Sequence, residues 1–112
     1  MKSRFIYLIA IVFALAVLSV PQMNAADSSA PVEVKIDNFS FSPPTVTIAA
    51  GTQVTWTNHD DIPHTVVSDD KTTFKSRALD TDEKFSFTFT KPGTYSYFCS
   101  IHPKMTAKVV VQ

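Results

Sequence analysis

Short runs of alternating apolar and polar residues, broken by turn residues, dominate this 112-residue chain after its first 26 residues. Val32, Val34 and Ile36, for example, alternate with charged side chains, and a period of two is typical of a β-strand with one buried face. No long helical pattern accompanies these runs. The expected strands cover residues 32–36, 45–49, 53–57, 64–68, 85–89, 95–99 and 107–111. About seven short strands in one small domain predict an all-β fold, an antiparallel β-sandwich.

Aromatic residues are expected to fill the core of this sandwich. The strand at 85–89 carries phenylalanine at every second position, which gives it a strongly aromatic inner face. Phe39 and Phe41 follow the first strand, and we expect both to cap the core. Phe74 and Leu79 are the expected anchors of a charged, irregular stretch.

The first 26 residues have a different composition. Lys2 and Arg4 precede the uncharged run 5–20, and a polar stretch with small residues follows. This is the layout of a secretory signal peptide, so we expect residues 1–26 to be cleaved and residues 27–112 to form one exported domain. Retention as a membrane anchor is the alternative, although 16 apolar residues fall just short of a full span.

The charge of the exported domain excludes one class of partner. The whole chain has ten basic and ten acidic residues. Loss of Lys2 and Arg4 leaves a formal net charge of −2. A domain without a basic excess has little to hold a phosphate backbone, so we expect no nucleic-acid binding. We also expect no membrane contact after cleavage, because no second long apolar run is present.

Cys99 is the only cysteine of the chain. It cannot form an internal disulfide, and an unpaired cysteine in an exported protein points to a partner chain, a reactive role or a metal. His102 and Met105 follow it at three-residue spacing. Thiolate, imidazole and thioether ligands together suit copper, and two His, one Cys and a weak axial Met form the electron-transfer copper site. One further histidine is therefore required.

Two histidines are candidates for this further ligand. His64 follows Pro63 at the start of a predicted strand, which fixes its place at a corner of the fold. His59 stands beside Asp60 and Asp61 in a polar loop that we expect to be solvated. We therefore favour His64 over His59.

Each candidate ligand also has a structural explanation. Cys99 could be a small buried apolar residue, Met105 could fill a gap in the core, and His102 could be a surface residue. However, Met105 is the only methionine after residue 26, and it flanks His102 together with the only cysteine. Chance explains this joint pattern poorly.

Residues 93–105, GTYSYFCSIHPKM, resemble those of a known family. They are similar to the small blue copper proteins, or cupredoxins, and most closely to the amicyanin and plastocyanin branch. Residues 54–58 (VTWTN) and 63–66 (PHTV) match the stretch that carries the family's first histidine. The short Cys-x-x-His-Pro-x-Met loop has the amicyanin form. The resemblance covers nearly all of residues 32–111, and it implies a Greek-key sandwich of seven to eight strands with copper at one end.

By matched position, the resemblance implies that His64, Cys99 and His102 are the equatorial ligands of one type 1 copper ion. Met105 would be the long axial ligand. The carbonyl of Pro63 would lie near the metal.

The chain departs from the family pattern at two positions. Thr65 replaces the Asn that usually ties the two ligand loops together, and its shorter hydroxyl is expected to reach Ser100. Ile101 stands where short loops often have Pro. Its backbone N–H is retained and is expected to point at the Cys99 sulfur, which would favour Cu(I).

The resemblance implies a small exported protein that shuttles single electrons between Cu(I) and Cu(II) and is not an enzyme. Its partners would be a redox protein donor and acceptor, such as a c-type cytochrome or a dehydrogenase. We expect a monomer, periplasmic in a Gram-negative bacterium and otherwise extracytoplasmic.

Three other functions are weighed against electron transfer. A periplasmic copper carrier or buffer is the first alternative, although such carriers tend to offer several Met or His residues. A copper enzyme would need a second metal site, for which only His59 remains. A metal-free sandwich module that mediates adhesion or interaction is the third.

Overall fold

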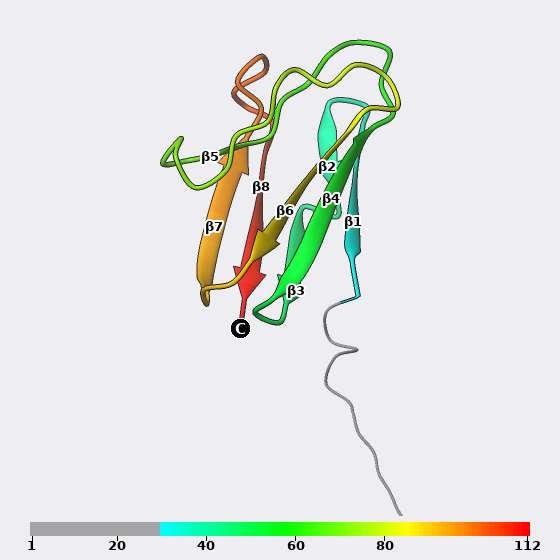
Figure 1. Cartoon of the computed structure of the whole chain (residues 1–112). Coiled ribbons are helices and arrows are strands. Elements are labelled where there is room, and N and C mark those ends of the chain that lie inside the picture. The colour runs from blue at the N-terminus through cyan, green and yellow to red at the C-terminus, as the bar shows by residue number, and fades with distance from the viewer. Residues whose placement is uncertain (1–29) are drawn as a thin grey trace, which may run out of the picture.

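The computed structural model describes residues 30–112, which form eight β-strands (Figure 1). The expected signal peptide, residues 1–26, lies outside the described residues. No helix that could cross a membrane is present within 30–112. The strands are β1 (Val32–Asp37), β2 (Ser40–Ser42), β3 (Thr45–Ile48), β4 (Thr52–Asn58), β5 (Val67–Ser68), β6 (Lys84–Phe89), β7 (Gly93–Phe98) and β8 (Thr106–Val111).

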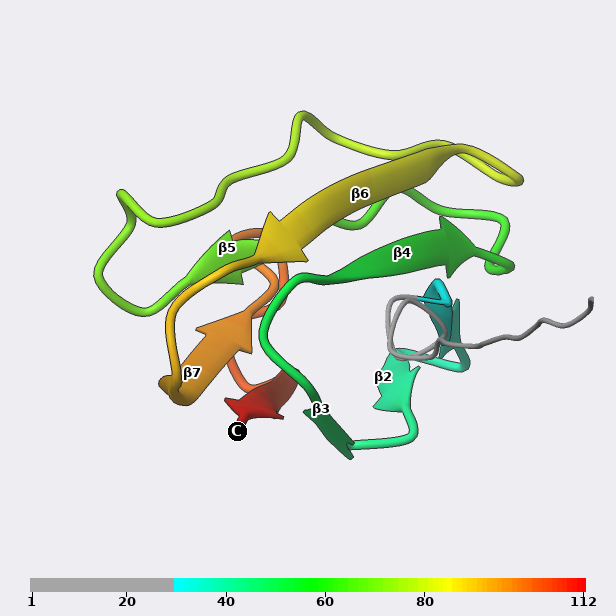
Figure 2. The ribbon, with the colours of Figure 1, turned by 60° about the horizontal axis from the view of Figure 1, so that its bottom comes forward.

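The strands form two four-stranded sheets, in the orders β2-β1-β4-β6 and β3-β8-β7-β5. In Figure 2, β4 and β6 lie side by side in one layer and β5 and β7 in the other. The chain changes sheet repeatedly between β2 and β7, which is the connectivity expected of a Greek-key sandwich. The predicted all-β sandwich of seven to eight strands is confirmed.

The strand directions differ in part from the antiparallel arrangement that we predicted. β1 pairs with β4 in parallel, and β3 pairs with β8 in parallel, while the other four pairings are antiparallel. Both sheets are therefore mixed. Each parallel pair joins strands that are separated in the chain by at least one strand of the other sheet, so no short hairpin connects them.

Two local predictions also need correction. β2 forms where we expected only the end of the first strand, and the predicted strand 64–68 shrinks to the two residues of β5. The segment before β5 pairs instead with the loop that contains Ser76. Val66 N–H donates to the Ser76 hydroxyl, and Ser76 N–H donates to the Val66 carbonyl, both at 2.8 Å.

Trp56 lies at the centre of the core between the sheets. The side chain is fully buried, and its ring packs on those of Phe74, Phe85, Phe89 and Tyr97 at centroid distances of 5.4–6.4 Å. The expected anchoring residues Phe74 and Leu79 are buried, and so is Phe41. Phe39 is not in the core, since 51% of it is exposed.

The strands β4 and β7 end at the same end of the sandwich, opposite the C-terminus (Figure 1). The turn between β1 and β2 lies at that end too. Loops that are far apart in sequence are therefore brought together there, and these loops carry the predicted ligands.

Candidate metal centre

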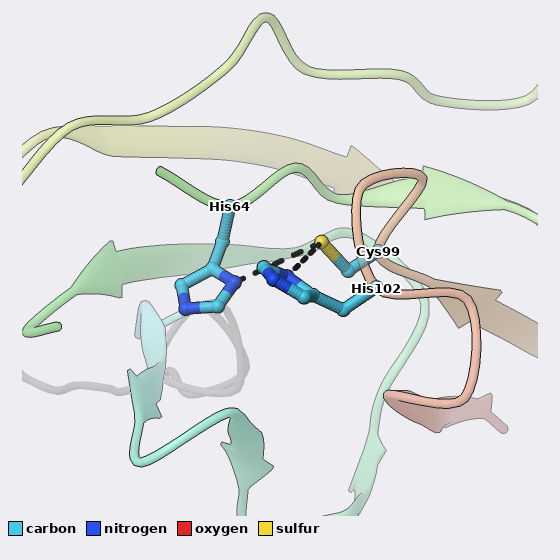
Figure 3. Close-up of side chains that lie close together, drawn as sticks. All are labelled: His64, Cys99 and His102. Carbon is cyan, nitrogen blue, oxygen red and sulfur yellow. Dashed lines mark hydrogen bonds between the residues drawn. The ribbon is translucent and has the colours of Figure 1, made fainter. Parts of the chain in front are cut away.

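His64, Cys99 and His102 converge at this end of the sandwich (Figure 3). One ligand atom from each residue lies within 4.8 Å of the other two. His64 and Cys99 are fully buried, and His102 is half-buried. His59 is exposed and is not part of this group.

The spacing of the three ligand atoms fits a single ion. The Cys99 Sγ lies 3.8 Å from Nδ1 of His64 and 3.8 Å from Nδ1 of His102. A metal bound in a trigonal plane by a thiolate at about 2.3 Å and an imidazole at about 2.1 Å separates these two atoms by about 3.8 Å. The residues therefore fit a small metal ion held by one sulfur and two nitrogens.

The backbone around His64 is fixed by the neighbouring loop. His64 and Leu79 form an isolated antiparallel bridge with N···O distances of 3.1 and 2.7 Å. The fully buried Asn58 side chain donates to the carbonyls of Ile62 and Leu79, both at 2.9 Å. Asn58 thus ties the end of β4 to both sides of the segment that carries His64.

The imidazole of His64 forms a hydrogen bond with Asp60. The distance from His64 Nε2 to Asp60 Oδ2 is 2.8 Å. Partial burial opposes ionisation of Asp60, but the N–H groups of Phe39 and Asn38 and the His64 ring outweigh it and hold the pKa of Asp60 below its usual value. Because an ionised carboxylate only accepts hydrogen bonds, Nε2 carries the proton. The lone pair of Nδ1 then faces Cys99.

Cys99, His102 and Met105 are held in a tight loop between β7 and β8. His102 N–H donates to the Cys99 carbonyl at 3.2 Å, and Met105 N–H donates to the His102 carbonyl at 2.9 Å. Cys99 N–H closes the loop on the Met105 carbonyl at 3.1 Å. Met105 is buried. The loop therefore carries three of the four sequence-predicted ligands on a backbone closed by three hydrogen bonds.

Thr65 supplies the backbone donor to the Cys99 sulfur. Its N–H lies 3.4 Å from Sγ. Burial would raise the pKa of Cys99, but this bond and the contacts with the His64 and His102 rings lower it to about 6. A thiolate is thus favoured at neutral pH, and the thiolate is the form that binds metal.

The expectation that Ile101 N–H points at the Cys99 sulfur is wrong. Within residues 30–112, the backbone of Thr65 donates to that sulfur at 3.4 Å, and a backbone hydrogen bond from His102 also helps to lower the pKa of Cys99. Among these residues, Ile101 forms no such bond. The reason is the turn closed by His102 N–H on the Cys99 carbonyl. That turn leaves Ile101 at its corner, where the side chain is 47% exposed.

The Thr65 hydroxyl reaches across to the other ligand loop. It accepts the N–H of Ser100 at 2.7 Å and lies 2.8 Å from the Ser100 hydroxyl. This is the contact that we expected from the sequence, and it joins the segment of His64 directly to that of Cys99. Pro63, beside His64, has an exposed side chain.

Sequence reasoning missed three residues that shape the site. The sequence predicts Asp60 in a solvated loop and Phe39 in the core, and it predicts no contact for the Asn58 side chain. The ring of Phe39 instead packs edge-on against those of His64 and His102. The one sequence feature that could have indicated Asp60 is the polar stretch just before His64. A buried ligand histidine needs a hydrogen-bond partner for its second ring nitrogen.

Comparison with known proteins agrees with this geometry. A family model described as a cupredoxin-like domain matches residues 8–111. The chain is 41% identical to amicyanin-alpha of Methylorubrum extorquens over 87 residues, which cover 71% of each chain. It is 36% identical to amicyanin of Paracoccus versutus over 105 residues, covering 88% of this chain and 78% of the relative.

A solved structure with the same fold is a purple cupredoxin from Nitrosopumilus maritimus. It superposes with a TM-score of 0.69 at 34% identity, over 72% of this chain and 99% of the other. The family and the His–Cys–His group together confirm the prediction of copper as the cofactor. The chain belongs to the cupredoxins, with amicyanins and plastocyanins among its relatives.

Proposed function

We propose that this protein is an exported carrier of single electrons that uses one type 1 copper ion. The observation that carries the proposal is the meeting of two imidazoles and one thiolate at spacings that fit one ion. Met105 lies in the same loop as Cys99 and His102. His64, Cys99 and His102 would be the equatorial ligands and Met105 the axial one. When bound, copper supplies one-electron chemistry between Cu(I) and Cu(II).

The packing around the ligands supports electron transfer over catalysis. His64 and Cys99 are fully buried and Met105 nearly so, which leaves little room for a substrate at the ion. The ligands are also held by backbone hydrogen bonds from several loops. A site that keeps its ligands in place in both oxidation states needs little reorganisation when an electron moves.

His102 is the proposed point of electron entry and exit. It is less buried than His64 and Cys99. Ile101 beside it and Phe39 packed on its ring are the two exposed large apolar side chains within residues 30–112. A redox donor and acceptor, such as a c-type cytochrome or a dehydrogenase, would dock here through a small interface and leave quickly.

The proposal includes the location of the protein. Residues 1–26 would serve as a cleaved signal peptide, and residues 27–112 would act as a monomer in the periplasm or another extracytoplasmic space. Mass spectrometry of the protein purified from the exported fraction tests the cleavage site. A mature chain that starts before residue 20 would contradict it.

Copper loading of the purified protein tests the site. We expect Cu(II) to give an intense thiolate-to-copper band in the visible spectrum, which Cys99→Ala abolishes. His59→Ala is the matched control, because His59 is exposed and stands outside the ligand group. A band that survives in Cys99→Ala, or none in the unaltered protein, would overturn the proposal.

A second measurement separates electron transfer from copper trafficking. An electron carrier is expected to pass through repeated cycles of reduction and oxidation without losing copper. A carrier or buffer would release the ion to a chelator in one of the two states.

A further inference from the structure

The turn between β1 and β2 has a backbone that its sequence does not favour. Asn38 and Phe39 adopt φ values of 52° and 59°. Asn tolerates this left-handed region, but a bulky residue such as Phe rarely enters it. Such a conformation persists only where surrounding contacts impose it.

The carboxylate of Asp60 supplies those contacts from a distant part of the chain. Oδ1 accepts the N–H of Asn38 at 2.6 Å, and Oδ2 accepts the N–H of Phe39 at 2.9 Å. Two successive N–H groups thus converge on one side chain more than twenty residues away. Consecutive N–H groups of this kind form a concave site for an anion.

The same carboxylate also holds the buried ligand. Oδ2 of Asp60, which bonds to Phe39, lies 2.8 Å from Nε2 of His64. The backbone of Asp60 is itself fixed, since its N–H donates to the Asn58 side chain and its carbonyl accepts the Thr81 hydroxyl. The side chain is only 12% exposed. Asp60 is therefore built into the site and is not a solvated loop residue.

The strained turn places the Phe39 ring over the two histidines. Its centroid lies 5.5 Å from that of His64 and 5.0 Å from that of His102, with interplanar angles of 86° and 81°. Half of the side chain is exposed, so burial in the core does not explain its position. The left-handed conformation instead brings the Phe39 ring into contact with both imidazoles.

We propose that Asp60 is a positioning residue of the metal centre, which both orients His64 and holds Phe39 as a cover over the two imidazoles. This inference rests on the proposed copper site. A carboxylate that accepts the second N–H of a ligand histidine makes the imidazole a stronger base, which favours Cu(II) and lowers the reduction potential. The Phe39 ring shields the same two ligands from water and small anions.

The reduction potential of Asp60→Asn tests the first role. Asn offers one acceptor oxygen and no charge for the three N–H groups that Asp60 accepts. We expect about a 10–100-fold loss of Cu(II) affinity with little change for Cu(I). A tenfold selective loss corresponds to an upward shift in potential of about 59 mV.

Asp61→Asn is the matched control. It removes the same charge one residue away, and the Asp61 side chain is exposed. A purely long-range effect of charge would shift both variants alike, and equal potentials in the two would overturn the first role. The nitrogen NMR shifts of His64 in the metal-free protein give a second readout. Loss of the carboxylate acceptor in Asp60→Asn should make the tautomer with the proton on Nε2 less dominant.

Phe39→Gly tests the second role and does not depend on the folding of the Asp60 variant. Glycine accepts a φ of 59°, and its N–H can still donate to Asp60. We expect faster removal of copper by a chelator and binding of azide to Cu(II). Neither should occur in Lys71→Gly, which places a glycine at another exposed position with a left-handed backbone, φ 63°. Unchanged rates would overturn the shielding role.

The outcomes separate this inference from the copper site itself. If the unaltered protein forms no blue complex, the proposed function fails. If it does form one, and Asp60→Asn behaves as Asp61→Asn, only the role of Asp60 fails.

Discussion

Thr65 is the residue at which the two ligand-bearing segments meet. Its backbone N–H reaches the Cys99 sulfur, and its hydroxyl accepts the N–H of Ser100. A short hydroxyl thus joins the loops where the family usually has the longer Asn side chain. One residue affects both the electron density on the thiolate and the rigidity of the pair of loops.

Thr65→Val is expected to lower the free energy of unfolding of the metal-free protein by about 1 kcal/mol, because Ser100 N–H loses its acceptor. The backbone bond to the Cys99 sulfur remains and only the longer contact of the Thr65 hydroxyl with that sulfur, 3.8 Å, is lost, so the thiolate-to-copper band should shift only slightly. Denaturant unfolding gives the stability difference. Ser100→Ala is the control, since it keeps the N–H bond to Thr65 and should cost less. Equal stability of Thr65→Val and the unaltered protein would show that the bond does not hold the loops.

The proposed ligands could be recognised in the sequence from their residue types, but the residues that contact them could not. Cys99, His102 and Met105 are close in sequence and chemically distinctive. Asp60 and Phe39 have no such signal, because their contact spans 21 residues and depends on a left-handed turn. The hydrogen bond from Thr65 N–H to sulfur depends on how two loops pack, which no local pattern encodes.

At the scale of the elements, β7 carries two tyrosines with opposite hydrogen-bonding states. The Tyr95 hydroxyl donates to the Lys91 carbonyl at 2.7 Å. The Tyr97 hydroxyl is buried and, among residues 30–112, has no hydrogen-bond partner. The ring centroid of Trp56 lies 5.4 Å from that of Tyr97, and the Trp56 indole N–H also has no hydrogen-bond partner among these residues. Two rings on one strand therefore make different contributions to stability.

Tyr97→Phe is expected to leave the free energy of unfolding at pH 7 unchanged or higher by up to about 1 kcal/mol, because it removes an unpaired buried hydroxyl. Tyr95→Phe breaks a hydrogen bond and should instead cost about 0.5–1.5 kcal/mol. Urea unfolding of the two variants compares them directly. A larger loss in Tyr97→Phe than in Tyr95→Phe would mean that the Tyr97 hydroxyl is paired in solution.

The buried hydroxyl of Tyr97 should also make the stability of the protein depend on pH in the alkaline range. Burial raises the pKa of Tyr97 to about 12, although the nearby Trp56 opposes the rise. The folded state then keeps its proton between pH 10 and 12 while the unfolded state loses it, so stability falls as the pH rises through that range. The loss reaches about 2–3 kcal/mol in the unaltered protein. Tyr97→Phe should lack this part of the decline. If the variant and the unaltered protein lose the same stability between pH 10 and 12, the decline does not come from Tyr97.

Alternation predicted the strands better than it predicted their pairing. The period of two in β1 and β6 indicates a strand but not its neighbour or the direction of that neighbour. The parallel pairing of β1 with β4 therefore could not be predicted from it. The predicted strand 64–68 has strand composition, but the Ser76 hydroxyl and the Leu79 backbone take hydrogen bonds that a neighbouring strand would otherwise make. Side-chain competition of this kind is a tertiary effect.

At the scale of the whole molecule, the metal centre depends on both sheets. His64 follows β4 of one sheet, and Cys99 and His102 follow β7 of the other. The ligands come together only when the two sheets pack and their loops lie at the same end (Figure 1). An unfolded chain holds Cys99, His102 and Met105 at short range but not His64.

Copper is therefore expected to bind the native state far better than the unfolded one and to stabilise it. Free copper at 100 times the dissociation constant adds about 2.7 kcal/mol, which for a domain of this size raises the melting temperature by about 10–20 °C. Calorimetry with and without Cu(I), under reducing conditions, measures the shift. For each variant, the melting temperature with copper is compared with that of the same variant without copper. The small change in packing that Cys99→Ala causes therefore cancels. Cys99→Ala and His64→Ala should lose most of the shift and His59→Ala none of it. If the melting temperature of the unaltered protein does not rise, copper does not bind the native state preferentially. If it rises equally in all three variants, the ion binds outside the junction of the sheets, and His64 and Cys99 do not hold it.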